Sequence, residues 1–220
     1  MPSHRRCPRG PSAAAAFTLV ELLVVIGIIG LLAGLLMPAM SRARRDAQKI
    51  VCMANQRDVG VHLQMYSTNS KGWMFPPLRG ADKPPEQRWT VFVFDGGAWN
   101  PKVMLCPSDL EPANEHSFLL NDNLTLQAIK NHTTHTGTGA TASDIIVMGE
   151  KCSSEPDYYM NPGSADYIGV VEYYRHGVNY GSNYLYLDGH VETATPAAAN
   201  QGIDPWNPAK PIPPPPAGSS

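Results

Sequence analysis

The longest apolar stretch of the chain lies near its N-terminus, at residues 17–37, and carries a single charge, Glu21. At about 1.5 Å per residue, a helix over this stretch would be roughly 30 Å long, enough to cross the hydrocarbon core of a bilayer. Glycine occurs in it at Gly27, Gly30 and Gly34, and the last two have the spacing of close helix–helix contacts in membranes. The pattern therefore predicts a membrane-spanning helix over about 17–37.

The same helix is predicted to continue beyond the apolar stretch to about residue 70. Apolar positions recur there at helical spacing. They are Ala43, Ala47, Ile50, Ala54, Val61 and Met65. We expect this face to pack on the rest of the chain. Pro38 is expected to kink or locally open the helix, because it removes one hydrogen bond and crowds the preceding turn. A helix this long, half apolar and half amphipathic, needs a membrane at one end or other copies of itself.

Residues 71–195 have the pattern of a loop-rich head domain with short strands. Strands are predicted at Trp89–Phe94, Val103–Cys106 and Asp144–Met148. The clearest hairpin joins Tyr184–Leu187 to His190–Thr193 through Asp188-Gly189, a pair suited to a type I′ turn. The sequence therefore predicts an α+β fold, in which an antiparallel sheet packs against the long helix.

Composition adds three expectations. The net charge of −2 gives no large field, so nucleic acid is not expected as a partner. Residues 196–220 are rich in Pro, Ala, Gly and Ser and are predicted to form a disordered tail. The spacing of the four cysteines, Cys7, Cys52, Cys106 and Cys152, matches no zinc pattern. If a disulfide forms, Cys106–Cys152 is the favoured pair, because both residues lie in the head.

The order of segments at the N-terminus is unusual for a secretory signal. Three arginines at positions 5–9 precede the small residues Ala13 to Ala16, and the apolar stretch follows them. A secretory signal places its small residues and its cleavage site after the apolar part. Cleavage after Ala16 would instead remove residues 1–16 as a leader and leave the apolar helix on the mature chain. It would also expose the amine of Phe17, one helical turn from Glu21, whose carboxylate is costly in lipid unless it has a partner.

The segment Phe17-Thr18-Leu19-Val20-Glu21 and the apolar residues after it resemble the cleavage and methylation signature of type IV prepilins and type II secretion pseudopilins. The resemblance implies that a prepilin peptidase cuts after Ala16 and methylates the amine of Phe17. It implies that Glu21 is the assembly residue, and that Pro38 holds the position of a proline common in this family. The residue before the cut is usually Gly, and here it is Ala16.

The resemblance also implies a structural role without catalysis and without a cofactor. Such a chain is a filament subunit that assembles with copies of itself and with minor subunits. An inner-membrane platform protein and its ATPase drive assembly, the helix crosses the bacterial inner membrane once, and the head lies in the periplasm. Lysine and arginine flank the span on both sides, so the charge distribution by itself does not fix the orientation.

The head contains a second, partial resemblance. His176, with Asp188 and Gly189 after it, is similar to a His, nine residues, Asp-Gly motif in one large branch of pilin-like proteins, but here 11 residues intervene. Cys106-Pro107-Ser108-Asp109 and the stretch 52–66 are also similar to that branch. The structural interpretation is that Asp188-Gly189 forms a turn and His176 bonds nearby backbone. The other interpretation is that His176, Asp188 and His190 together bind a ligand or a metal.

Other candidate chemistry in the head is sparse. His132 and His135 lie in a loop-like stretch, and Asp157, Asp166 and Glu172 offer oxygen ligands for Ca²⁺. No nucleophile elbow, P-loop or dinucleotide motif is present. Two alternatives to a filament subunit remain. One is a membrane-tethered protein that binds a glycan or another ligand through aromatic residues such as Trp73, Trp89, Trp99, Tyr158 and Tyr159. The other is a tethered hydrolase that uses the His176 set.

Overall fold

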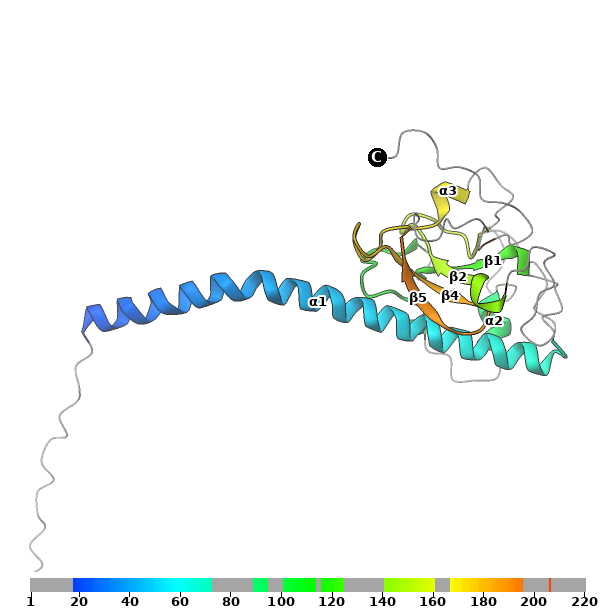
Figure 1. The fold of residues 1–220 in the computed structure, drawn as a ribbon, viewed down its shortest axis with the longest axis horizontal. Coiled ribbons are helices and arrows are strands. Elements are labelled where there is room, and N and C mark those ends of the chain that lie inside the picture. Colours follow the sequence, from blue (N-terminus) through cyan, green and yellow to red (C-terminus); the bar gives the residue numbers. More distant parts are fainter. Residues whose placement is uncertain are drawn as a thin grey trace, which may run out of the picture. The chain divides into compact units, whose positions relative to one another are not determined.

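The computed structural model describes residues 18–72, 89–94, 101–113, 116–124, 141–160, 167–195 and 206. The chain divides into two units, Met1–Ala43 and Arg44–Ser220. Helix α1 (Leu19–Asn69) contributes its first part to one unit and its second part to the other (Figure 1). All other described elements belong to the second unit, which is the head.

The long N-terminal helix is confirmed. α1 is helical without a break through Pro38, and the Ser41 hydroxyl donates a hydrogen bond to the Met37 carbonyl at 3.0 Å. The expected kink at Pro38 stays a prediction, as do the proposed boundaries of leader, helix and head. Residues 16 and 17, on either side of the expected cleavage site, lie outside the described residues.

The face that α1 turns toward the head differs from the predicted one. The buried positions follow helical spacing and are Cys52, Gln56, Val59, Leu63 and Ser67. Ile50, Val61 and Met65, on the predicted face, are more than half exposed at 63%, 54% and 55%. The prediction was wrong because it chose one of two apolar faces of the helix and left out Val59 and Leu63, which are apolar and buried. The buried Gln56 is accommodated because its amide donates a hydrogen bond to the Asn183 carbonyl at 3.1 Å.

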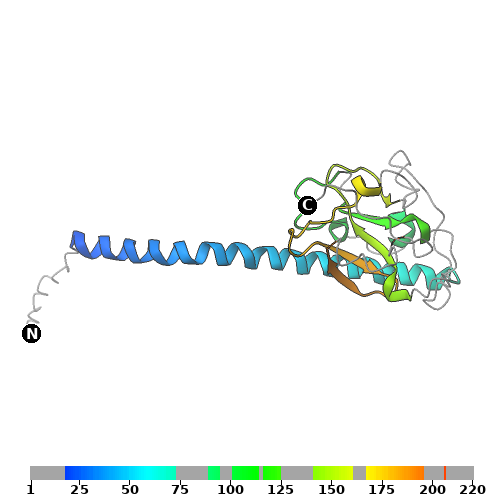
Figure 2. The same cartoon turned by 45° about the horizontal axis from the view of Figure 1, so that its top comes forward.

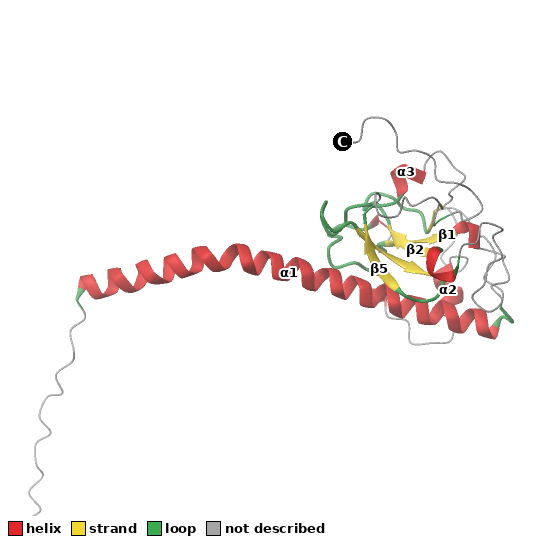
Figure 3. Ribbon diagram, viewed as in Figure 1, coloured by secondary structure: helices red, strands yellow, loops and turns green. Residues whose placement is uncertain are grey.

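The head contains one sheet of five strands in the order β3-β1-β2-β4-β5. The strands are β1 (Phe118–Asn121), β2 (Ile146–Glu150), β3 (Tyr159–Met160), β4 (Ser182–Tyr186) and β5 (Val191–Ala194). Four of them pair antiparallel as predicted, whereas the edge strand β3 runs parallel to β1. Figures 2 and 3 show the sheet lying along the second part of α1, which confirms the α+β, pilin-like architecture.

The C-terminal hairpin forms as predicted, but its turn is of another type. β4 and β5 pair from Ser182↔Ala194 to Leu185↔Val191, and the connection runs from residue 187 to 190. Gly189 has a φ of 90°, while Lys71 is the non-glycine residue with positive φ within the described part of the chain. Asp188 therefore has negative φ, and a type I′ turn, which needs positive φ at both central residues, is excluded.

Two predicted strands are not strands. Trp89–Phe94 forms the short helix α2, in which Trp89, Val93 and Phe94 are buried while Val91 is exposed. Val103–Cys106 belongs to a 3₁₀ turn at Pro101–Met104 and the residues after it. Both were short apolar runs, which periodicity alone does not assign to strand or helix. A further short helix, α3 (Tyr167–Val170), and strand β1 were not predicted.

Both faces of the sheet are covered. One face packs on α1 and α2 in a core that includes Val59, Leu63 and Trp89. On the other face Tyr184 packs against Trp206, which is 3% exposed. The Asn121 amide donates a hydrogen bond to the Trp206 carbonyl at 2.9 Å. The predicted disordered tail is therefore corrected at this position, and the rest of 196–220 lies outside the described residues.

Candidate functional site

The first candidate site is the N-terminal end of α1. Thr18 precedes the helix, and its backbone N–H and its hydroxyl donate hydrogen bonds to Glu21 Oε2 at 2.9 and 2.8 Å. The Glu21 N–H in turn donates to the Thr18 hydroxyl oxygen at 3.2 Å. This reciprocal pair is a capping box, which satisfies two N–H groups at the start of a helix. Glu21 therefore has a local structural role that the sequence analysis did not consider.

The part of α1 that follows Glu21 has an apolar surface without cover in the single chain. Among the described residues, α1 is the helix whose length and composition would allow it to cross a membrane, with a mean hydropathy of 2.8 over its most apolar window. A Cβ added to Gly27, Gly30 or Gly34 would meet nothing within 4 Å in the described structure. These glycines therefore leave an open strip along the helix.

The second candidate site is a buried group of four side chains in the head, which we call the head cluster. Its members are Cys52, Cys106, Glu150 and His176. They come from four separate segments: α1, the loop after the 3₁₀ turn, the end of β2, and the loop before β4. One potential ligand atom of each lies within 4.8 Å of the others, and all four side chains are buried. No pair is close in sequence, which explains why the spacing of cysteines gave no signal.

Distances inside the head cluster centre on one oxygen of Glu150. The Cys52 thiol donates a hydrogen bond to Oε1 at 2.8 Å, and His176 Nε2 lies 3.0 Å from the same oxygen. Cys106 Sγ is 3.9 Å from His176 Nε2. The other carboxylate oxygen, Oε2, accepts a hydrogen bond from the Asn183 backbone N–H at 2.9 Å. The sulfur atoms of the two cysteines, the Nε2 nitrogen of His176 and the Oε1 oxygen of Glu150 thus lie close to one another.

Burial and mutual contacts shift the pKa values of the four groups. Burial raises the pKa of the Cys52 thiol well above its usual value. The hydrogen bond with Cys52, joined by one with His176, lowers the pKa of the Cys106 thiol to about 7. Burial alone would lower the pKa of His176, but its contacts with Cys106 and Glu150 raise that pKa to about 9. Burial likewise would raise the pKa of Glu150, and the hydrogen bond and charge of His176 lower it instead.

The segment Cys106–Asp109 faces the dipeptide Arg175-His176 with three side chains. Cys106 lies in the head cluster beside His176, and Ser108 Oγ is 3.4 Å from His176 Nδ1. The buried Asp109 forms an ion pair with Arg175 at 3.3 Å. Arg175 also donates hydrogen bonds to the Ser153 hydroxyl and to the Lys151 carbonyl. The Cys-Pro-Ser-Asp segment singled out in the sequence thus fixes the position of His176.

The structure separates the predicted set of His176, Asp188 and His190. His176 is buried in the head cluster, whereas Asp188 and His190 contact each other at 2.5 Å on the exposed turn after β4. The hypothesis of a joint ligand, metal or catalytic set is therefore wrong. The structural interpretation holds for Asp188-Gly189, which lies in the turn. It also holds for His176, whose backbone N–H donates to the nearby Gly181 carbonyl at 3.0 Å, while its side chain contacts Glu150 and Asn183.

The other candidates of the head have ordinary positions or lie outside the described residues. Cys52, Cys106 and Cys152 are all free thiols, and Cys106 lies near Cys52, so the favoured Cys106–Cys152 disulfide is wrong. Asp157 and Glu172 accept hydrogen bonds from backbone N–H groups of their own loops. Trp89, Tyr158 and Tyr159 are buried core residues and do not form a glycan-binding surface. His132, His135, Trp73, Trp99 and Asp166 lie outside the described residues.

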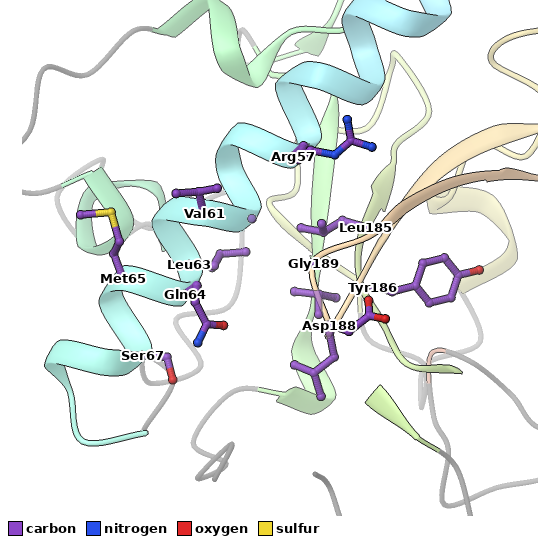
Figure 4. Close-up of a pocket in the computed structure, with 13 residues that line it drawn as sticks. Arg57, Val61, Leu63, Gln64, Met65, Ser67, Leu185, Tyr186, Asp188 and Gly189 are labelled. Carbon is purple, nitrogen blue, oxygen red and sulfur yellow. The ribbon is translucent and has the colours of Figure 1, made fainter. Parts of the chain in front are cut away.

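A groove of about 410 Å³ runs between α1 and the end of β4. Figure 4 shows Val61, Leu63 and Met65 from the helix on one side and Leu185 with Asp188 on the other. Gly60 also lines the groove, and a Cβ added there would be 2.9 Å from Leu185 Cδ1. Its lining is mainly apolar, and it is a feature of how closely the helix approaches the hairpin.

The fold and the N-terminal site define an α+β, pilin-like chain with a long apolar helix near its N-terminus. Residues 11–37 match the family model of the prokaryotic N-terminal methylation motif. This match supports a processed subunit of the type IV pilin-like or pseudopilin type, and with it membrane anchoring and assembly with other subunits. The chain has no match among curated proteins or solved structures.

Proposed function

We propose that this chain is a structural subunit of a pilus-like filament, of the type II secretion pseudopilus kind, which is cut after Ala16, methylated on Phe17 and assembled through Glu21. The observation that carries the proposal is the order of segments within the matched residues 11–37: small residues, then Phe17, then an apolar helix with one carboxylate in its first turn. The role is mechanical. The helix stores the subunit in the membrane and later lies in the filament.

The carboxylate of Glu21 is the link between subunits in this proposal. Both hydrogen bonds from Thr18 go to Oε2, and the ammonium of a neighbour's Phe17 would approach Oε1. Pairing two opposite charges in an apolar setting compensates for the desolvation of each, and it fixes the axial register between neighbouring helices.

Two surfaces of α1 support association between copies. Gly27, Gly30 and Gly34 leave an open strip in the first part of the helix, where another helix could approach closely. In the second part, Ile50, Val61 and Met65 are exposed, although their spacing is that of a contact face. Both surfaces gain cover when helices bundle. We further propose that an inner-membrane platform and its ATPase drive assembly, and that the head lies in the periplasm.

The capping box allows the charge of Glu21 to be tested apart from its local role. Glu21→Gln retains an acceptor for the Thr18 N–H, as glutamine also serves in capping boxes, but it has no charge. Thr18→Ala removes the box and keeps the charge. We expect Glu21→Gln to abolish filaments seen by electron microscopy, as Glu21→Ala would, and Thr18→Ala to retain them. All three should resist carbonate extraction from membranes. Normal filaments from Glu21→Gln would refute the pairing mechanism.

Processing is tested by the intact mass and the N-terminal sequence of the protein recovered from membranes. The expected chain begins at Phe17 and is heavier than the unmodified sequence by one methyl substitution. Ala16→Gly should be processed at least as completely, since glycine is the usual residue before the cut. Natural protein that retains Met1 and its basic leader would rule out the exposed amine, and with it the proposed assembly.

A further inference from the structure

The head cluster has the composition of a transition-metal site. It offers two sulfur atoms, one imidazole nitrogen and one carboxylate oxygen, which are the ligand types that Zn²⁺ accepts. Thiolates favour borderline and soft cations over Ca²⁺ or Mg²⁺. We propose that the head cluster binds one zinc ion with four protein ligands. This proposal goes beyond the filament function and does not depend on it.

The geometry of the head cluster fits one tetrahedral ion. Zinc–sulfur bonds of about 2.3 Å and zinc–nitrogen or –oxygen bonds of about 2.0 Å place tetrahedral ligand atoms roughly 3.3–3.8 Å apart. The observed separations are 2.8 Å for Cys52 Sγ to Glu150 Oε1, 3.0 Å for His176 Nε2 to Glu150 Oε1, and 3.9 Å for Cys106 Sγ to His176 Nε2. The other three pairs of ligand atoms lie within 4.8 Å of each other, so shifts of up to about 1 Å would seat the ion.

The surroundings of the head cluster have the features of a metal site's outer contacts. Metal-bound histidine usually bonds through its second ring nitrogen, and metal-bound carboxylates are themselves hydrogen-bonded. His176 Nδ1 faces the Ser108 hydroxyl, and Glu150 Oε2 accepts from the Asn183 N–H. Ser108 and His176 also line an open pocket, which gives an ion a path from solvent.

A bound cation also accounts for the close contact between His176 and Glu150. In a metal-free cluster, His176 Nε2 lies 3.0 Å from the Glu150 carboxylate. When Nε2 and Oε1 both bind zinc, their contact needs no shared proton. The Asn183 side-chain amide nitrogen, 2.9 Å from Nε2, would then shift away, because the metal takes the lone pair of that ring nitrogen. Binding displaces the protons of the two thiols and the imidazolium, and the three anionic ligands leave a net charge of −1 with Zn²⁺.

Four protein ligands make a closed site, which is the form of structural zinc. The ion would join α1 to the end of β2 and to the two loops that carry Cys106 and His176. Its effect is therefore to hold the helix on the sheet, and it leaves no coordination position for a substrate.

The first test is the metal content of the wild-type full-length chain. The protein is purified in mild detergent from zinc-supplemented cells, under reducing conditions and without chelators, and its metals are measured by mass spectrometry. We expect about one zinc per chain. A chain that holds no zinc even after reconstitution with Zn²⁺ would overturn the proposal. So would a Cys52–Cys106 disulfide, seen as a chain lighter by two hydrogens in protein purified in parallel without reductant.

Matched variants test the ligand assignment. Cys52→Ser and His176→Ala should each lower the zinc content at least tenfold. Cys152→Ser and His190→Ala remove the same residue types outside the head cluster and should retain about one zinc per chain. Ser108→Ala removes the outer partner of His176 and should weaken binding by about 10- to 100-fold. Equal loss in the two Cys variants, or zinc retained in Cys52→Ser, would contradict the assignment.

Cobalt bound to the wild-type protein gives a readout that does not depend on how well any variant folds. Wild-type protein loaded with Co²⁺ should show thiolate-to-cobalt charge-transfer absorption. Excess zinc should abolish the signal by displacement. If wild-type protein binds cobalt without thiolate absorption, the cysteines are not ligands and the proposal falls.

Discussion

Trp206 packs on the sheet from a part of the chain that is distant in sequence, and its substitution should lower the free energy of unfolding. A buried tryptophan covers about 150–250 Å², which at 25 cal/mol per Å² corresponds to roughly 4–6 kcal/mol. Fixing its backbone and side chain offsets about 2 kcal/mol of this. Since Trp206 is 3% exposed and packs edge-to-face on Tyr184, we expect Trp206→Ala to lower the free energy of unfolding by about 2–4 kcal/mol.

The assay is urea unfolding of the full chain in mild detergent, followed by far-ultraviolet circular dichroism, because fluorescence would change with the loss of the indole. Tyr174→Ala removes an aromatic side chain that is 46% exposed, and it should cost no more than about 0.5 kcal/mol. A loss below that value for Trp206→Ala would refute the reasoning, because the indole would then contribute little to stability.

Gly149 provides an independent check on the same contact. A Cβ at this position would lie 2.7 Å from Trp206 Cη2, so Gly149→Ala should displace the indole. The double variant with Trp206→Ala should then be hardly less stable than either single variant. Additive losses would mean that the cost of Gly149→Ala arises at Tyr184 Cδ1, 3.0 Å from the added Cβ, and not at the indole.

Two further glycines give predictions by the same assay. Gly60→Ala gains about 1 kcal/mol of helix propensity but brings a Cβ to 2.9 Å from Leu185 Cδ1, and such overpacking costs about 1–3 kcal/mol. The free energy of unfolding should therefore fall by about 1 kcal/mol. A rise would mean that the Leu185 side chain moves aside freely. Gly181→Ala places its Cβ 1.9 Å from the Ala194 carbonyl oxygen at a φ of 90°. It should therefore cost at least about 2 kcal/mol more than Gly177→Ala, which has positive φ but meets only a Tyr180 ring carbon at 3.8 Å; equal losses would show that strain at positive φ is the whole effect.

The sequence predicted best where the signal depends only on residues close together in the chain. The long apolar stretch and the helical spacing after it predicted that α1 is a helix, and the Asp188-Gly189 pair located the hairpin. Trp89–Phe94 failed for the opposite reason: a segment of six residues, five of them apolar, fits a strand or a short helix equally well. In α2 the burial of Trp89, Val93 and Phe94 follows helical spacing.

Sequence patterns of this kind could not predict the head cluster. Cys52, Cys106, Glu150 and His176 are each isolated in sequence, and only the fold brings them together. One signal was present. Cys52 begins the buried face that continues through Gln56 and Val59, and a face that mixes polar and sulfur-containing side chains indicates specific partners rather than a plain apolar core.

Asn183 has a consequence for the order of events during synthesis. Its backbone and side chain contact Gln56, Glu150, His176 and Thr193, so these segments remain unjoined until the ribosome has passed residue 183 and β5 has followed. The apolar N-terminal part of α1 forms through contacts between residues a few positions apart, so its folding does not depend on the synthesis of residue 183. The apolar segment of α1 can therefore become helical while the head is still an unfolded chain.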